Sequence, residues 1–251
     1  SYVNNSGASF VSWLWKANGS GVSNTDGTIT STVSANADAG FSIVDFDGTG
    51  TTSTVGHGLS HPVELVIQKA RTSSNDWQVY QGSLGKDKTM QLNKTAAAGT
   101  YSNYWGTSEP TSSVFGLGTL GGNNTNGMNY IAYCFHSVDG YSKVGSYTGN
   151  GSSDGTFVYT GFRPAYVLIK SSSLAQNWTM YDASRDEDNI VHHRLYPMSS
   201  SAEAGDTVEQ YLDFTSNGFK LRHSNNNQNG SGATYIYLAF AEHPFKHTNA
   251  R

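Results

Sequence analysis

An internal repeat dominates the sequence, and its two copies meet within residues 129–144. The first half of this stretch, YIAYCF at 130–135, returns near the end of the chain as YIYLAF at 235–240. The second half, GYSKV at 140–144, echoes GFSIV at 40–44. A period of about 100 residues is too long for a solenoid unit and suits a duplicated module. One copy ends where the next begins, so the sequence predicts two homologous modules in tandem.

The markers of the two copies follow the same order at a slowly growing separation. Phe41 and Tyr141 are 141 − 41 = 100 residues apart, and Tyr130 and Tyr235 are 235 − 130 = 105 apart. Loop insertions in a duplicated domain produce such a drift. We expect a closing strand and connector at 1–39, module 1 at 40–138, and module 2 with its tail at 139–251.

Aromatic residues at matched positions are predicted to form the structural core of each copy. Burying large rings is the main source of stability in a module with few charges. The two tryptophans have a second interpretation as platforms for a sugar ring. The predicted core residues are Trp77, Tyr80, Tyr130 and Phe135 in module 1, and Trp178, Tyr181, Tyr235 and Phe240 in module 2.

The sequence of each copy predicts several short strands separated by Asn-Gly, Asp-Gly and Gly-Gly turns. The 28 glycines and 15 tyrosines favour this pattern, and no stretch has a convincing helical period. The expected fold class is all-β, with two antiparallel β-sandwich-like modules. Residues 130–135 carry apolar groups on both faces, so this strand should lie centrally or between the modules.

The closing motif, an Asn/Gly turn followed by an alternating aromatic strand, occurs three times, whereas the body of the repeat occurs only twice. The first occurrence, at residues 4–15, is therefore a strand from a further module, or one that completes it. We expect it to dock on a module by β-addition, within the chain or on a neighbouring chain. The residues predicted to make this contact are Phe10, Trp13 and Trp15.

Charge and cysteine content exclude several classes of function. The net charge is −4 without a basic run, which argues against a nucleic-acid surface. Cys134 is the single cysteine, so no intrachain disulfide framework is possible, and its apolar strand predicts a buried thiol. No apolar run approaches the roughly 18 residues of a membrane-spanning helix. We expect no nucleic-acid partner and no membrane insertion.

Few residues in the sequence suggest a catalytic or metal-binding role. The sequence GSSDG at 151–155 matches a nucleophile elbow, but its flanks predict a hairpin turn. His192 and His193 would point to opposite faces of a strand, which argues against a shared metal ion, and a surface strand or loop is favoured. Carboxylates at 45–47 and 186–188 could hold Ca²⁺, with solvated turns as the alternative. We therefore expect no catalytic residue and no metal site, with Ca²⁺ as the one open cofactor.

The loop at residues 100–110 departs most from its repeat partner, because it places three aromatic residues in a polar segment. Flat rings can cover the C–H face of a sugar while amides and carboxylates bind its hydroxyls. The alternative is a loop that buries its rings on its own module or on another subunit. The candidate glycan-binding residues are Tyr101, Asn103, Tyr104, Trp105 and Glu109.

Five motifs carry a resemblance to a known family. They are WQVY at 77–80, TSSVFGLG at 111–118, YIAYCF at 130–135, GSYTGNG at 145–151 and PAYVLIK at 164–170. YLDF at 211–214, with GFKL at 218–221, carries the same resemblance. Together they resemble a repeat of tailed-bacteriophage virion proteins, found in tail fibres and appendages and often beside concanavalin-like or laminin-G-like modules. The resemblance covers about residues 40–245.

This resemblance implies a non-enzymatic virion structural protein at the virion surface, with other virion proteins and a host glycan or receptor as partners. It also implies a homo-oligomer, with a trimer favoured. Three alternatives stay open: a carbohydrate-binding lectin-like module of a cell, a purely structural capsid or filament subunit, and a glycan-cleaving tailspike. The last needs paired carboxylates. Glu109, Asp186, Glu187 and Glu203 are available, but no motif pairs them.

Overall fold

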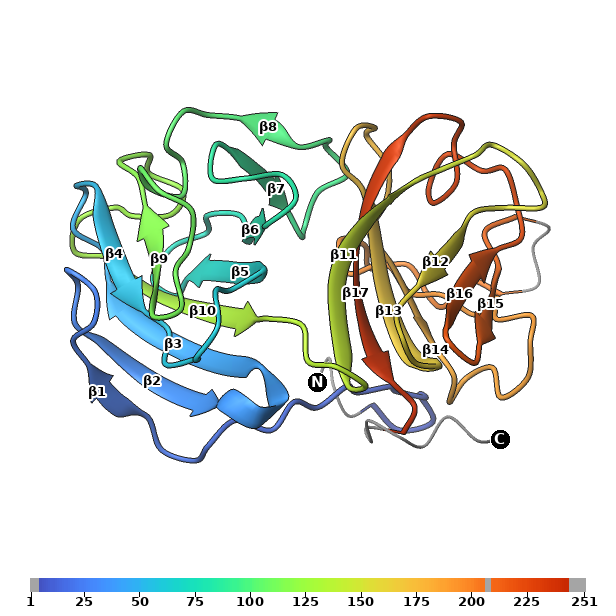
Figure 1. Ribbon diagram of the computed structural model, residues 1–251, viewed down its shortest axis with the longest axis horizontal. Coiled ribbons are helices and arrows are strands. Elements are labelled where there is room, and N and C mark those ends of the chain that lie inside the picture. The colour runs from blue at the N-terminus through green and yellow to red at the C-terminus, as the bar shows by residue number, and fades with distance from the viewer. Residues whose placement is uncertain (1–4, 206–208, 244–251) are drawn as a thin grey trace.

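The protein consists of two β-rich lobes that lie side by side (Figure 1). The computed structural model describes residues 5–205 and 209–243, so residue 4 of the predicted first turn and the tail 244–251 lie outside the described residues. The paired strands of the two lobes are antiparallel, which confirms the predicted all-β class. The described residues form no α-helix, and their one helical turn is the 3₁₀ turn Ala37–Ala39.

Module 1 contains a large sheet and a small one. The large sheet has the order β1-β2-β3-β10-β5-β6-β7-β8, and the small one pairs β4 with β9. Its strands are β1 (Val22–Asn24), β2 (Ser31–Asn36), β3 (Phe41–Asp47), β4 (Ser53–Gly56), β5 (Leu65–Ala70), β6 (Gln78–Gln81), β7 (Lys88–Gln91), β8 (Gly99–Thr100), β9 (Val114–Leu117) and β10 (Asn129–Phe135).

Module 2 repeats this plan with fewer strands. A four-stranded sheet has the order β11-β17-β13-β14, and a three-stranded sheet has the order β12-β16-β15. Its strands are β11 (Ser142–Thr148), β12 (Phe157–Tyr159), β13 (Pro164–Ser171), β14 (Thr179–Asp182), β15 (Leu212–Thr215), β16 (Gly218–Leu221) and β17 (Thr234–Ala241).

The strand pairing itself is duplicated. In module 1 the strand β10 lies between β3 and β5, and in module 2 the strand β17 lies between β11 and β13. The pairs β4–β9 and β12–β16 also correspond. Strands β1 and β2 extend the large sheet beyond β3 and have no counterpart among the described residues of module 2. The duplication seen in the sequence is thus also present in the hydrogen-bonded framework.

Three apolar clusters hold the molecule together. Each module has its own core, and a third cluster lies between the two large sheets. Strand β10 serves both sides, because Cys134 lies in the core of module 1 while Phe135 lies in the cluster between the modules. The expectation that this strand lies centrally and between modules is confirmed.

Most of the predicted core residues are buried, but in two different places. Tyr80, Tyr130, Tyr181 and Tyr235 lie inside the core of their own module. Trp77 departs from the prediction, since it is only half-buried and stacks on Tyr133 with ring centroids 6.4 Å apart. The remaining three, Phe135, Trp178 and Phe240, fill the cluster between the modules.

The N-terminal segment packs against both modules without forming a strand, so the predicted β-addition does not occur within the chain, and docking on a neighbouring chain stays a prediction. Residues 8–18 form no strand. Trp15 instead packs its ring against those of Phe135 and Phe240, at centroid distances of 6.2 and 5.6 Å, one from each module. Trp13 packs edge-on against Tyr166 at 5.6 Å, whereas Phe10 is 55% exposed. The segment therefore closes one edge of the junction between the modules.

Candidate functional site

The aromatic loop at residues 100–110 buries two of its five candidate glycan-binding residues. Tyr104 and Trp105 are 5% and 1% exposed and belong to the core of module 1, where Trp105 packs against Tyr80 at 5.8 Å. Burial of large rings outweighs the polarity of the loop around them. Tyr104 and Trp105 cannot stack on a sugar, and the alternative that the loop buries its rings on its own module applies to both.

The other three candidates in this loop stay at the surface. Glu109 accepts hydrogen bonds from the Tyr80 hydroxyl at 2.9 Å and from the Lys86 backbone N–H at 3.0 Å, so it ties the loop to the module. Asn103 is exposed, and Tyr101 is 47% exposed. The structure therefore divides the five residues into two in the core, one that anchors the loop, and two that remain accessible.

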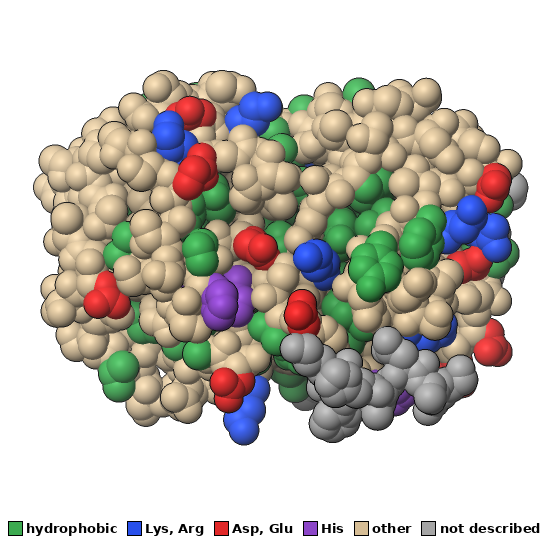
Figure 2. All heavy atoms as spheres, viewed as in Figure 1, with side chains coloured by type: hydrophobic (Ala, Val, Ile, Leu, Met, Phe, Trp, Pro, Cys, Tyr) green, Lys and Arg blue, Asp and Glu red, His purple; other side chains and the backbone are tan. Residues whose placement is uncertain are grey.

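Strand β12 presents two aromatic side chains on the outer face of the small sheet of module 2. Phe157 and Tyr159 are 45% and 65% exposed, while Val158 between them is buried. Side chains alternate along a strand, so the two rings share one face. Lys220 lies opposite Phe157 on β16 and forms an ion pair with Asp154 at 2.6 Å. Figure 2 shows hydrophobic side chains beside basic and acidic ones over this part of the surface.

The same face is partly covered in module 1. Gly56 of β4 stands where β12 has Tyr159, and Gly116 of β9 stands where β16 has Lys220. A side chain at Gly56 would collide with Asn24, and one at Gly116 would lie only 2.5 Å from the backbone of the aromatic loop. The two copies thus differ on this face, where glycines of module 1 lie against neighbouring segments and module 2 carries exposed rings.

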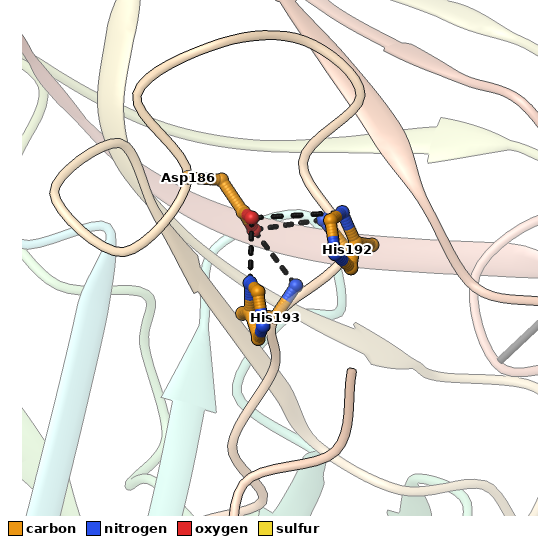
Figure 3. Close-up of side chains that lie close together, drawn as sticks. All are labelled: Asp186, His192 and His193. Carbon is orange, nitrogen blue, oxygen red and sulfur yellow. Dashed lines mark hydrogen bonds and ion pairs between the residues drawn. The ribbon is translucent and has the colours of Figure 1, made fainter. Parts of the chain in front are cut away.

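A second cluster joins Asp186, His192 and His193 in the segment between β14 and β15 (Figure 3). One Asp186 oxygen, Oδ2, accepts the backbone N–H groups of His192 and His193 at 2.8 and 2.7 Å. The other, Oδ1, lies 2.6 Å from His193 Nδ1 and 3.5 Å from His192 Nδ1. The two imidazole rings lie 4.4 Å apart.

This geometry corrects the prediction that the two histidines point apart. His192 and His193 lie in a loop and not in a strand, so the alternation of side chains does not apply. Burial of the Asp186 carboxyl opposes its ionisation, but the His193 ring and the two backbone N–H groups bond to it and hold its pKa below the usual range. The cluster pairs a buried anion with two half-buried imidazoles.

The two carboxylate segments considered for Ca²⁺ differ in the structure. In the segment 186–188, Asp186 is buried with the histidines while Glu187 and Asp188 are exposed. In the segment 45–47, the Asn129 side-chain amide donates to both Asp45 Oδ1 and Asp47 Oδ1 at 3.0 Å, and Asp45 also forms an ion pair with Arg71 at 2.8 Å. Within residues 5–205 and 209–243, the one group of three metal-binding side chains is the Asp186 cluster.

A shallow cleft of about 490 Å³ near the junction of the modules was not predicted from the sequence. His61 and His136 lie on its wall with ring centroids 4.9 Å apart, and Asp38 and Asp139 line it as well. His136 Nε2 is buried without a hydrogen-bond partner among the described residues. These residues lie far apart in the sequence, so no local motif could have predicted the cleft.

A family model described as a domain of unknown function, DUF7483, matches residues 1–244. The chain belongs to the DUF7483 family. No curated protein and no solved structure matches it. In the described part of this DUF7483 chain, no helix is long and apolar enough to cross a membrane.

Proposed function

We propose that this DUF7483 chain is a non-enzymatic structural protein of a tailed-phage virion, part of a tail fibre or surface appendage that attaches to a host glycan. The resemblance of the five sequence motifs supports the virion assignment. It also supports a homo-oligomer, with a trimer favoured, exposed at the virion surface and in contact with other virion proteins. The two-module body acts as a rigid support for a binding face.

The exposed pair Phe157 and Tyr159 is the observation that carries the attachment role. Two rings on one face of β12 offer a flat apolar strip suited to the C–H face of a sugar. Lys220 and Asp154 stand beside the strip, where charged groups can bind hydroxyls. Several weak sites on one oligomer would add up by avidity. The strip thus replaces the 100–110 loop as the proposed glycan contact.

Three of the four carboxylates considered for glycan cleavage make structural bonds, and the fourth, Glu187, is exposed. Glu109 binds Tyr80 and the Lys86 backbone in module 1. Glu203 binds Arg185 at 2.6 Å in module 2, and Asp186 accepts two backbone N–H groups. A cleaving enzyme needs a proton donor and a second carboxylate facing one bond. These contacts favour a binding role over a hydrolytic one.

A glycan array probed with the purified full chain tests the proposal. We expect binding to a bacterial surface polysaccharide that falls about tenfold in the double variant Phe157→Ala, Tyr159→Ala, because stacking on an aromatic ring contributes about 0.5–1.5 kcal/mol per ring. Tyr101→Ala is the matched control, since it removes an exposed ring from the loop of module 1.

The outcomes separate the alternatives. Binding that Tyr101→Ala abolishes and the double variant retains would return the site to the 100–110 loop. No binding by the unmodified chain would favour a purely structural capsid or filament subunit. Specific binding by a protein that never associates with virions would favour a lectin-like module of a cell.

A further inference from the structure

We propose that Asp186, His192 and His193 bind one divalent transition-metal ion of the zinc, copper or nickel class. This site is independent of the proposed glycan strip, because it lies in the segment between β14 and β15 and not on β12. Its three side chains come from one loop and converge on a common point (Figure 3).

The spacing of the ligand atoms suits a small ion. One ligand atom from each residue lies within 4.8 Å of the other two. Bonds of about 2.0–2.1 Å at tetrahedral angles place ligand atoms about 3.3 Å apart. The separations of 2.6 and 3.5 Å from Asp186 Oδ1 to the two Nδ1 atoms lie on either side of this value. Small rotations of the rings would therefore admit an ion among the three atoms.

Hydrogen bonds hold the Asp186 carboxylate in a position suited to metal binding. Its Oδ2 oxygen is fixed by the backbone N–H groups of His192 and His193, which leaves Oδ1 directed at the two imidazoles. His192 Nδ1 also lies 3.0 Å from the Ile190 carbonyl oxygen, and an ion would take the place of that contact. Each imidazole side chain is 31% exposed, so an ion can enter from solvent.

The donor set selects the class of metal. Two imidazole nitrogens and one carboxylate oxygen favour Zn²⁺, Cu²⁺ or Ni²⁺ over Ca²⁺ and Mg²⁺, which prefer oxygen ligands throughout. Three protein ligands leave at least one position for water. The ion would cross-link the loop at Asp186 to the chain at His192 and His193.

The site also adjoins the N-terminal segment. Arg185, next to Asp186, bonds to Asp182 at 2.7 Å and to Glu203 at 2.6 Å. Its guanidinium lies over the Trp13 ring, 5.8 Å from the ring centre. An ion that fixes Asp186 would therefore also restrict the neighbouring Arg185, which packs on the Trp13 ring. Metal binding should thus raise the melting temperature of the whole chain.

Isothermal titration calorimetry of the tag-free, chelator-treated full chain with ZnCl₂ tests this inference. We expect saturable binding at one ion per chain and a melting temperature raised by about 5 °C at saturation. His193→Ala should weaken the affinity at least tenfold and abolish the thermal shift. Titration with CuCl₂ should give a visible absorption band from imidazole ligation that the same variant removes.

Two further variants keep the test decisive. His61→Ala removes a histidine from the other stacked pair and should leave binding unchanged. His192→Ala serves as a second ligand variant if His193→Ala does not fold. Equal affinity in the ligand variants and the unmodified chain, or loss of binding in His61→Ala, would overturn the inference. Absence of a one-to-one binding event would do the same.

Discussion

The indole N–H of Trp178 donates a hydrogen bond to the backbone carbonyl of Gln91, 2.9 Å away, and this bond crosses from module 2 to module 1. Trp178 is 1% exposed and lies in the cluster between the large sheets. Its repeat partner Trp77 is half-buried on the face of Tyr133. Duplicated residues have thus acquired different roles, one at the junction and one near the surface.

Replacing these tryptophans should therefore have unequal effects. We expect Trp178→Ala to lower the free energy of unfolding by about 3–5 kcal/mol, because it empties a fully buried site and removes the bond to Gln91. Trp77→Ala should cost roughly 1–2 kcal/mol, since much of its ring already contacts water. Urea unfolding of both variants measures the difference, and equal losses would contradict the assignment of Trp178 to the junction.

The N-terminal segment should stabilise the junction through Trp15. The ring contacts residues of both modules, so Trp15→Ala should lower the free energy of unfolding by about 2 kcal/mol. Leu14→Ala is the control, because Leu14 is 90% exposed and should change stability by less than about 0.5 kcal/mol. Thermal unfolding of the two variants decides the matter, and an unchanged melting temperature for Trp15→Ala would refute it.

His223 should make the fold sensitive to acid. Burial, with a smaller contribution from the charge of Arg194, lowers its pKa to about 4. Its Nδ1 accepts the Asn225 backbone N–H at 3.0 Å, and Nε2 is buried without a hydrogen-bond partner among the described residues. Between pH 6.5 and 4 the unfolded chain gains a proton here that the folded chain does not.

Stability should therefore fall as the pH drops through that window, with roughly 3 kcal/mol lost from this residue by pH 4. His223→Asn keeps an acceptor near the position of Nδ1 but cannot titrate. The unfolding free energy of this variant should fall less steeply with decreasing pH than that of the unmodified chain. The difference between the two slopes should reach about 1.4 kcal/mol per pH unit. Parallel curves from pH 7 to 4 would show that His223 is not the titrating group.

Short-range patterns predicted the framework well. Alternation in residues 130–135 predicted a strand with two apolar faces, and the structure places Cys134 and Phe135 on opposite sides of it. The matched spacing of Tyr130 and Tyr235 predicted equivalent strands, and both lie centrally in their sheets. These features depend on residues close in sequence, where period and turn chemistry suffice.

Features that depend on distant contacts were not predictable in the same way. Trp105 follows a polar segment, and its burial depends on Tyr80, which lies far away in the sequence. The histidine pair was expected in a surface strand or loop, and only the fold of the loop brings both rings to Asp186. Comparison of the copies could have suggested Phe157 and Tyr159, since Thr54 and Gly56 occupy the matching positions of module 1.

The packing of the two large sheets against each other determines where this chain can be divided. A fragment that ends at residue 138 would expose Phe41, Leu65 and Phe135, all of which are covered by module 2. The single copy is therefore a repeat in the sequence, but only the two modules together keep these apolar side chains away from water. A gene rearrangement that transfers this segment therefore has to transfer both copies. A shortened chain made for expression likewise has to contain both modules.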